Sequence, residues 1–97
     1  MPLFVVTRER GHGWDWSRAL TEQELWDEHA DFVDALVEAG LIRLGGPVGD
    51  RGWPLVIAEA DEAETVRARL LEDPWEPLHM LTEPRVEEWD LRLGSLS

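Results

Sequence analysis

The sequence predicts an α+β domain of the ferredoxin-like type, with the element order β-α-β-β-α-β. Runs rich in β-branched and aromatic residues occur at 3–7, 41–44, 53–59 and 85–93. Two amphipathic segments with a period near 3.6 residues lie between the first and second runs and between the third and fourth. The simplest arrangement of this order is a four-stranded antiparallel sheet with both helices on one face.

Length and composition limit the chain to one domain. The 97 residues are 43% hydrophobic, which is too apolar for a disordered chain and enough for one modest core. We therefore expect a single domain spanning residues 1–97.

Charge and residue content exclude several classes of function. The net charge is −12 and all nine basic residues are arginine, so no basic patch for nucleic acid or for an anionic membrane surface is expected. Cysteine is absent, which excludes disulfides and thiol nucleophiles. No apolar run approaches the ~20 residues of a membrane span, and the N-terminus lacks the pattern of a signal peptide. A cytoplasmic protein is expected.

The first amphipathic segment predicts a helix over residues 21–40. Thr21 and Glu24 have the spacing of a capping box. Gly40 suits the position after a helix, because glycine adopts a left-handed conformation without steric cost. The helix is therefore expected to begin at Thr21 and to end before Gly40.

An imidazole lies within the apolar stripe of this helix. His29 falls between Leu25 on one side and Phe32 and Leu36 on the other, at helical spacing. The residues alone leave two interpretations open: a core histidine with a satisfied hydrogen bond, or a functional group.

Two loops flank the helix. Residues 8–20 contain two closely spaced tryptophans, Trp14 and Trp16, and we interpret this loop as a flap that folds over a neighbouring surface. The segment 45–52, GGPVGDRG, is predicted to end the second strand and to form a hairpin connection. It has no lysine and no following helix, so it is not a phosphate-binding loop.

The second half of the chain predicts one more helix and the last strand. Asp61, with Glu64 three residues later, is expected to open the helix, and Pro74 to end it. The run 85–93 alternates in polarity and predicts a strand with one solvated side.

Two helices can cover only one face of the sheet, so the other face is expected to meet a second copy of the chain. We predict a homodimer, or a larger assembly built on it, in which two sheets pack face to face over more than about 1,000 Å².

Four motifs in this order resemble the YciI-like (YCII-related) family. They are Trp26-Asp27-Glu28-His29 followed by Phe32, Leu36 and Gly40; Gly45-Gly46-Pro47; Asp73-Pro74-Trp75; and Val86-Glu87-Glu88-Trp89. The resemblance covers nearly the whole chain. It implies a single YciI-like domain that forms a dimeric α+β barrel from ferredoxin-like protomers.

The resemblance also implies a catalytic pair, which maps onto His29 and Asp73. One family member is similar to a dehydrochlorinase that acts on a chlorinated hydroxyquinol. The resulting hypothesis is a small enzyme of isomerase, lyase or dehydrochlorinase type that uses acid–base chemistry and no cofactor. His12, His29 and His79 lack the spacing of a metal motif, so no metal is expected.

We expect the substrate, a small aromatic molecule, to stack on Trp14, Trp16 and Trp75, with Gly46 and Pro47 at the rim of the cleft. The alternative is a non-catalytic dimer that binds a small molecule or serves as an accessory protein. The sequence leaves both hypotheses open.

Overall fold

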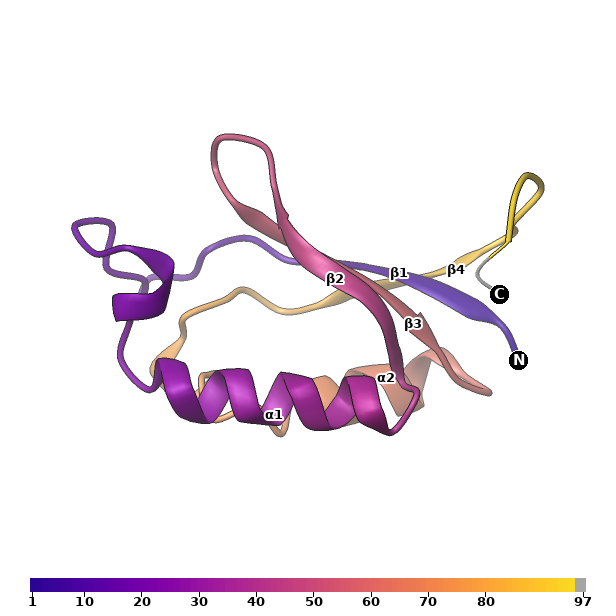
Figure 1. Cartoon of the computed structure of the whole chain (residues 1–97), viewed down its shortest axis with the longest axis horizontal. Helices are drawn as coiled ribbons and strands as arrows, with labels where there is room; N and C mark the ends of the chain where they lie inside the picture. The colour runs from indigo at the N-terminus through magenta and orange to yellow at the C-terminus, as the bar shows by residue number, and fades with distance from the viewer. Residues whose placement is uncertain (96–97) are drawn as a thin grey trace.

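Residues 1–95, described by a computed structural model, form a four-stranded antiparallel sheet with two helices across one face (Figure 1). The last two positions of the predicted domain, 96 and 97, lie outside the described residues. The sheet has the order β2-β3-β1-β4. Its elements are β1 (Leu3–Thr7), α1 (Trp26–Glu38), β2 (Ile42–Val48), β3 (Trp53–Glu59), α2 (Ala63–Leu70) and β4 (Arg85–Trp89), with 3₁₀ turns η1 (Leu20–Glu22) and η2 (Glu76–Leu78). The predicted ferredoxin-like α+β fold is confirmed.

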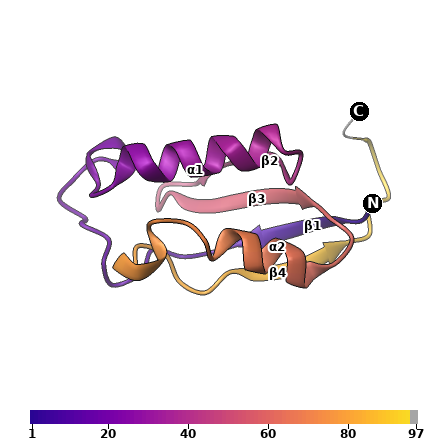
Figure 2. The same ribbon diagram turned by 90° about the horizontal axis from the view of Figure 1, so that it is seen from below.

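The core lies between the sheet and the helices. Phe4 and Val6 project from the central strand β1 toward the helices, and Phe4 lies opposite Ala58 of β3. Figure 2 shows α1 over the β2 side of the sheet and α2 over the β4 side. The buried cluster consists of Phe4, Val6, Leu36, Leu41, Ile42, Ala58, Ala60, Val66 and Leu70.

The segment Gly45-Gly46-Pro47 does not end the second strand, contrary to the prediction. It lies within β2, where Pro47 is opposite Pro54 of β3. Proline is tolerated because β2 is an edge strand and needs no second set of backbone donors. The β2–β3 hairpin is therefore long, and Figure 1 shows its tip rising away from the helix layer.

The first helix begins at Trp26, five residues later than predicted. Leu25 has φ 58° and ψ 30°, a left-handed conformation that cannot continue into a right-handed helix. The backbone before it forms the η1 turn instead, where Glu22 Oε1 accepts a hydrogen bond from the Ala19 N–H at 3.2 Å. The predicted capping box of Thr21 and Glu24 is therefore wrong.

The end of this helix is as predicted. Gly40 has φ 84°, and its N–H donates to the Val37 carbonyl at 3.0 Å. The Leu41 N–H donates to the Leu36 carbonyl at 3.0 Å, which completes a Schellman motif.

The two later elements are shorter than predicted. α2 begins at Ala63 after Glu62, without a side-chain cap, and ends at Leu70, well before Pro74. β4 ends at Trp89 because that residue lies opposite Leu3, the first residue of β1, and no partner strand continues beyond it.

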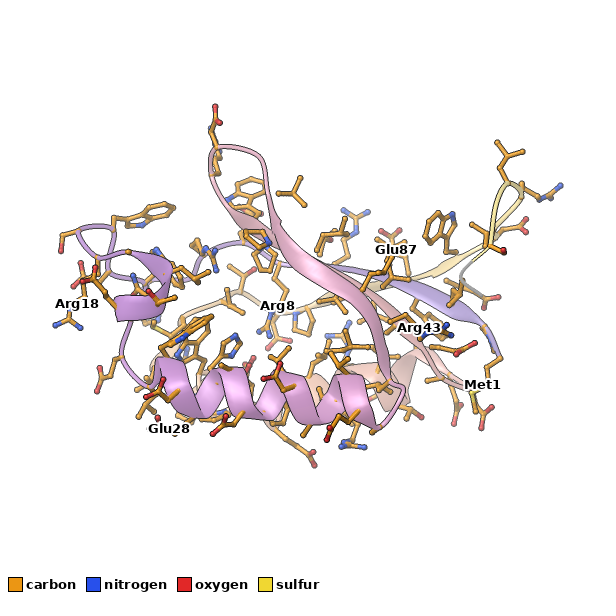
Figure 3. The ribbon with its side chains drawn as sticks, in the orientation of Figure 1. Met1, Arg8, Arg18, Glu28, Arg43 and Glu87 are labelled. Carbon is orange, nitrogen blue, oxygen red and sulfur yellow. The ribbon has the colours of Figure 1, made fainter. Side chains whose placement is uncertain are left out.

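The face of the sheet opposite the helices is apolar and uncovered in the single chain. Leu44, Val48 and Trp89 project from this face and are 55%, 54% and 41% exposed. Glu87 lies on the same side, away from the helices (Figure 3). Neither helix in the described part of the chain is long and apolar enough to cross a membrane.

Candidate active site

A cleft of about 320 Å³ lies between one side of α1, the β2–β3 hairpin and the connector that follows α2. Most of its wall is apolar. Its charged or titratable lining residues are Arg8, Arg10, His29, Asp34 and Asp73. These side chains come from the segment after β1, from α1, and from the connector, so only the tertiary structure brings them together.

His29 and Asp73 form a direct contact at this cleft. His29 Nδ1 lies 2.6 Å from Asp73 Oδ2, and the two side chains are 16% and 5% exposed. A carboxylate can only accept, so Nδ1 carries the proton and Nε2 of the neutral ring is the unprotonated nitrogen. Within residues 1–95 the His29 ring has no second hydrogen bond. Its Nε2 is therefore available to a molecule in the cleft.

The turn Asp73-Pro74-Trp75 holds the carboxylate in place. Asp73 Oδ1 accepts a hydrogen bond from the Trp75 backbone N–H at 2.8 Å, and the Asp73 carbonyl accepts one from the Glu76 N–H at 2.9 Å. The side-chain bond is the Asx turn expected of an aspartate in this position. Both carboxylate oxygens are thus engaged, one by the turn and one by His29.

Trp75 fixes the plane of the imidazole. Its ring stacks on His29 with centroids 3.6 Å apart and an interplanar angle of 5°. Trp75 is 2% exposed, and its Nε1–H donates to the Glu24 carbonyl at 2.7 Å. Hydrogen bonds therefore hold Trp75 at its backbone N–H and at its Nε1–H, and its ring presents a fixed face to His29.

Arg8 fastens the connector to the end of β1. Its Nε donates to the Thr82 carbonyl at 2.7 Å, and its Nη2 lies 2.5 Å from Glu76 Oε1. The side chain is 7% exposed and lies between the sheet and α1 (Figure 3). This ion pair supports the segment that carries Asp73.

Arg10 also borders the cleft, but its contacts differ. Its Nη2 donates to the Gly52 carbonyl in the hairpin, and its guanidinium carbon lies 3.8 Å from the centroid of the Trp14 ring. Partial burial lowers the pKa of the Arg10 guanidinium below its ordinary value.

Neither arginine was predicted as a site residue, although the sequence contains a signal for both. Phe4 and Val6 alternate toward the helices, and Arg8 and Arg10 continue the same alternation past the end of β1.

The predicted binding residues divide into two groups. Gly46, Pro47 and Trp75 border the cleft. Trp14 is half-buried and packs edge-on against Trp75, with centroids 5.6 Å apart, but does not border the cleft. Trp16 is 68% exposed and does not border it either.

The loop interpreted as a flap is fastened at two places. The N–H groups of Gly11 and Gly13 donate to the carbonyls of Met80 and His79, each at 2.9 Å. At the other end, the buried Gln23 accepts from the Asp15 N–H at 3.1 Å and donates to the Asp15 carbonyl at 2.7 Å. These hydrogen bonds fix the loop at both ends, and it packs behind Trp75 through Trp14.

The other two histidines lie apart from this site. His12 and His79 stack on each other with centroids 4.6 Å apart, and both are exposed. Residues 1–95 contain no cluster of three histidine, aspartate or glutamate side chains placed to hold a metal ion.

Comparison with known proteins gives a likeness of fold. No protein-family model matches the sequence, and no curated protein matches it. Among solved structures, the chain is similar to the 5-chloro-2-hydroxyhydroquinone dehydrochlorinase of Burkholderia phenoliruptrix AC1100, in complex with 2,5-dihydroxybenzoquinone. The TM-score is 0.60 with 23% sequence identity, over 91% of this chain and 93% of that one. The likeness establishes a shared ferredoxin-like α+β fold.

Proposed function

We propose that the chain is a YciI-like enzyme that performs acid–base chemistry on a small aromatic substrate without a cofactor. The observation that carries the proposal is the 2.6 Å contact between His29 Nδ1 and Asp73 Oδ2 at the border of the cleft. Because this contact engages Nδ1, the other ring nitrogen of His29, Nε2, would act as the general base. The fold shared with a dehydrochlorinase supports this reaction class.

In this proposal His29 Nε2 removes a proton from the bound substrate. Asp73 keeps the ring in the required tautomer and stabilises the imidazolium that forms, while stacking on Trp75 holds the ring in plane. In a dehydrochlorination, the electron pair left by the proton forms a new double bond as chloride departs. The balance is loss of HCl, which needs no oxidant. Return of the proton to another atom would give an isomerisation.

The test uses 5-chloro-2-hydroxyhydroquinone as the probe and measures release of chloride. Replacement His29→Gln should lower kcat by about 10²–10⁴-fold, the usual contribution of a general base. Asp73→Asn should also lower it, because an amide can donate to Nδ1 and favour the wrong tautomer. His12→Gln, at an exposed histidine outside the cleft, is the matched control and should leave turnover unchanged.

One result would narrow the proposal and another would contradict it. If the unaltered chain releases no chloride, it is not a dehydrochlorinase of this probe, and isomerase substrates should then be screened. If His29→Gln turns over any identified substrate at the original rate, His29 is not the base.

The apolar wall of the cleft also suits a non-catalytic binding protein. In that case a small aromatic ligand would bind with equal affinity to the unaltered chain and to His29→Gln, and neither would convert it. Calorimetric titration alongside the chloride assay separates the two functions.

We also propose a homodimer through the uncovered face of the sheet. Leu44 and Val48 at one edge of this face and Trp89 at the other are large apolar side chains exposed to water, and such exposure is typical of a surface that meets another protein. Sedimentation velocity at micromolar concentration should show a dimer. Leu44→Glu should give monomers, whereas Leu71→Glu, an exposed leucine just after α2 that is 38% accessible, should not. A monomeric unaltered chain would contradict the proposal.

A further inference from the structure

We propose that Arg10 is an anion-binding subsite of the cleft, so that the substrate is a small flat molecule with one ionised group. The inference deepens the proposed function and rests on it in taking this cleft as the substrate site. The subsite would bind a carboxylate, phenolate or enolate oxygen, while the aromatic body lies against the apolar wall near His29.

The charge of Arg10 is not neutralised by the protein. Arg8, Arg18, Arg43, Arg67, Arg69, Arg85 and Arg92 each have a carboxylate within 4.0 Å. Among residues 1–95, Arg10 and Arg51 have none. The acceptor of Arg10 is the neutral carbonyl of Gly52, and Arg51 is exposed on the hairpin tip. In a chain of net charge −12, a half-buried cation without an acidic partner is an unusual arrangement.

The guanidinium is also held in one orientation. One plane faces Trp14 at 3.8 Å, one nitrogen is bound to the hairpin, and the backbone of Arg10 is bridged to Leu81. A guanidinium has five N–H donors in a fixed fork, so donors remain for a ligand in the cleft. Partial exclusion of water strengthens such a contact relative to one on the open surface.

The charges around Arg10 favour a single negative charge on the ligand. Arg8 is neutralised by Glu76, and Asp73 is engaged by His29 and by its own turn. Asp34 is exposed at the α1 side of the cleft and would repel a second negative charge. Apart from His29, the surface that the ligand would meet is mostly apolar.

The test compares two ligands of one shape by isothermal titration calorimetry: 2,5-dihydroxybenzoate and the neutral 2,5-dihydroxybenzamide. The unaltered chain should bind the carboxylate at least about tenfold more tightly, as expected for a charge-assisted hydrogen bond. Arg10→Gln should remove this preference, and Arg10→Lys should keep part of it. Arg51→Gln removes the other arginine without an acidic partner, which lies outside the cleft. This variant should retain the full preference for the carboxylate. Raising the salt concentration should reduce the preference.

Equal binding of the two ligands by the unaltered chain would overturn the inference. So would an unchanged preference in Arg10→Gln, or no measurable binding of the carboxylate at millimolar concentration. Circular dichroism and thermal unfolding establish that each variant is folded. If Arg10→Gln is unfolded, Arg10→Lys takes its place, and its preference for the carboxylate should be smaller than that of the unaltered chain. His29→Gln separates this test from the test of catalysis: it should lower turnover as stated above and leave the preference for the carboxylate intact.

Discussion

The space between the helices and the sheet has a closed end and an open end. At the closed end, Phe4 of β1 and Leu36 of α1 belong to the buried cluster and are 2% and 1% exposed. Toward the open end, the same strand row continues to Arg8 and the same helical stripe continues back to His29, and both side chains border the cleft. Both ends follow the same strand alternation and the same helical stripe. The cleft thus lies where the inward-facing positions of these two rows carry titratable side chains in place of apolar ones.

The backbone explains why the open end is hollow. β1 ends at Thr7, opposite Leu55, while the β2–β3 hairpin continues past that point without a third strand beside it. α2 has only eight residues and ends at Leu70. The hairpin rises away from α1 in Figure 1, and the cleft lies between these two elements. The walls are completed by loops, which are held by backbone and side-chain hydrogen bonds.

The sharpest contrast between the two ends uses neighbouring residues on α1. Leu36→Ala empties a packed position and should lower the free energy of unfolding by about 2–5 kcal/mol. Val37→Ala, at a residue that is 48% exposed and borders the cleft, should change it by no more than about 0.5 kcal/mol. Urea denaturation measures both. Similar losses at the two positions would mean that the cleft is packed like the core.

Substitutions in the loop behind Trp75 should destabilise the protein nearly as much as substitutions in the core. A Cβ at Gly13 would lie 1.8 Å from the Leu78 carbonyl oxygen, so Gly13→Ala must displace backbone and should cost about 1–3 kcal/mol. Gly46→Ala is the control, since a Cβ there meets nothing within 4 Å, and should cost no more than about 0.5 kcal/mol. If thermal melts show the two variants to be equal, the loop is not a fixed wall.

The ion pair at the open end should contribute more than one on the surface. Arg8→Met leaves Glu76 without its partner and should cost about 1–2 kcal/mol. Arg85→Met breaks the pair with Glu87, whose side chains are 74% and 60% exposed, and should cost no more than about 0.5 kcal/mol. A double-mutant cycle of Arg8→Met with Glu76→Gln measures the coupling. A coupling near zero would show that Arg8 acts by packing alone.

The smallest expected effect concerns the tryptophan under His29. Trp75→Phe keeps an aromatic face but loses the Nε1–H bond to the Glu24 carbonyl, which should cost about 0.5–1.5 kcal/mol. Trp16→Phe, at the 68% exposed position, should be neutral. Chemical-shift changes of the His29 ring in the first variant, absent in the second, would show that Trp75 orients the imidazole. Identical spectra would contradict that role.

Local signals in the sequence were enough for several elements. The predicted strands at 3–7 and 53–59 agree with β1 and β3, and Gly40 ends α1 as its conformational freedom indicates. The start of α1 could not be predicted in this way. The left-handed conformation of Leu25 follows a segment held by Trp75 and the buried Gln23, and Trp75 is a partner distant in sequence.

The site was predicted in part. The resemblance implied the pairing of His29 with Asp73, and the two side chains are in contact, although a catalytic role stays a prediction. Arg8 and Arg10 were not predicted, because they follow the last residue of β1 in a segment that the sequence predicts to be a loop. Trp14 and Trp16 were assigned to the cleft by residue type alone, and the direction of a loop side chain depends on contacts that the local sequence does not contain.

By itself, the sequence determined the order of elements, the apolar rows of β1 and α1 and the end of the first helix. These features depend on period and on local conformational preference, which a few neighbouring residues decide. Only the tertiary structure decided that β2 runs through Gly45-Gly46-Pro47, where α1 begins, and which side chains meet at the cleft. Each of these depends on the free energy of contacts between residues far apart in the chain, such as Trp75 with Glu24.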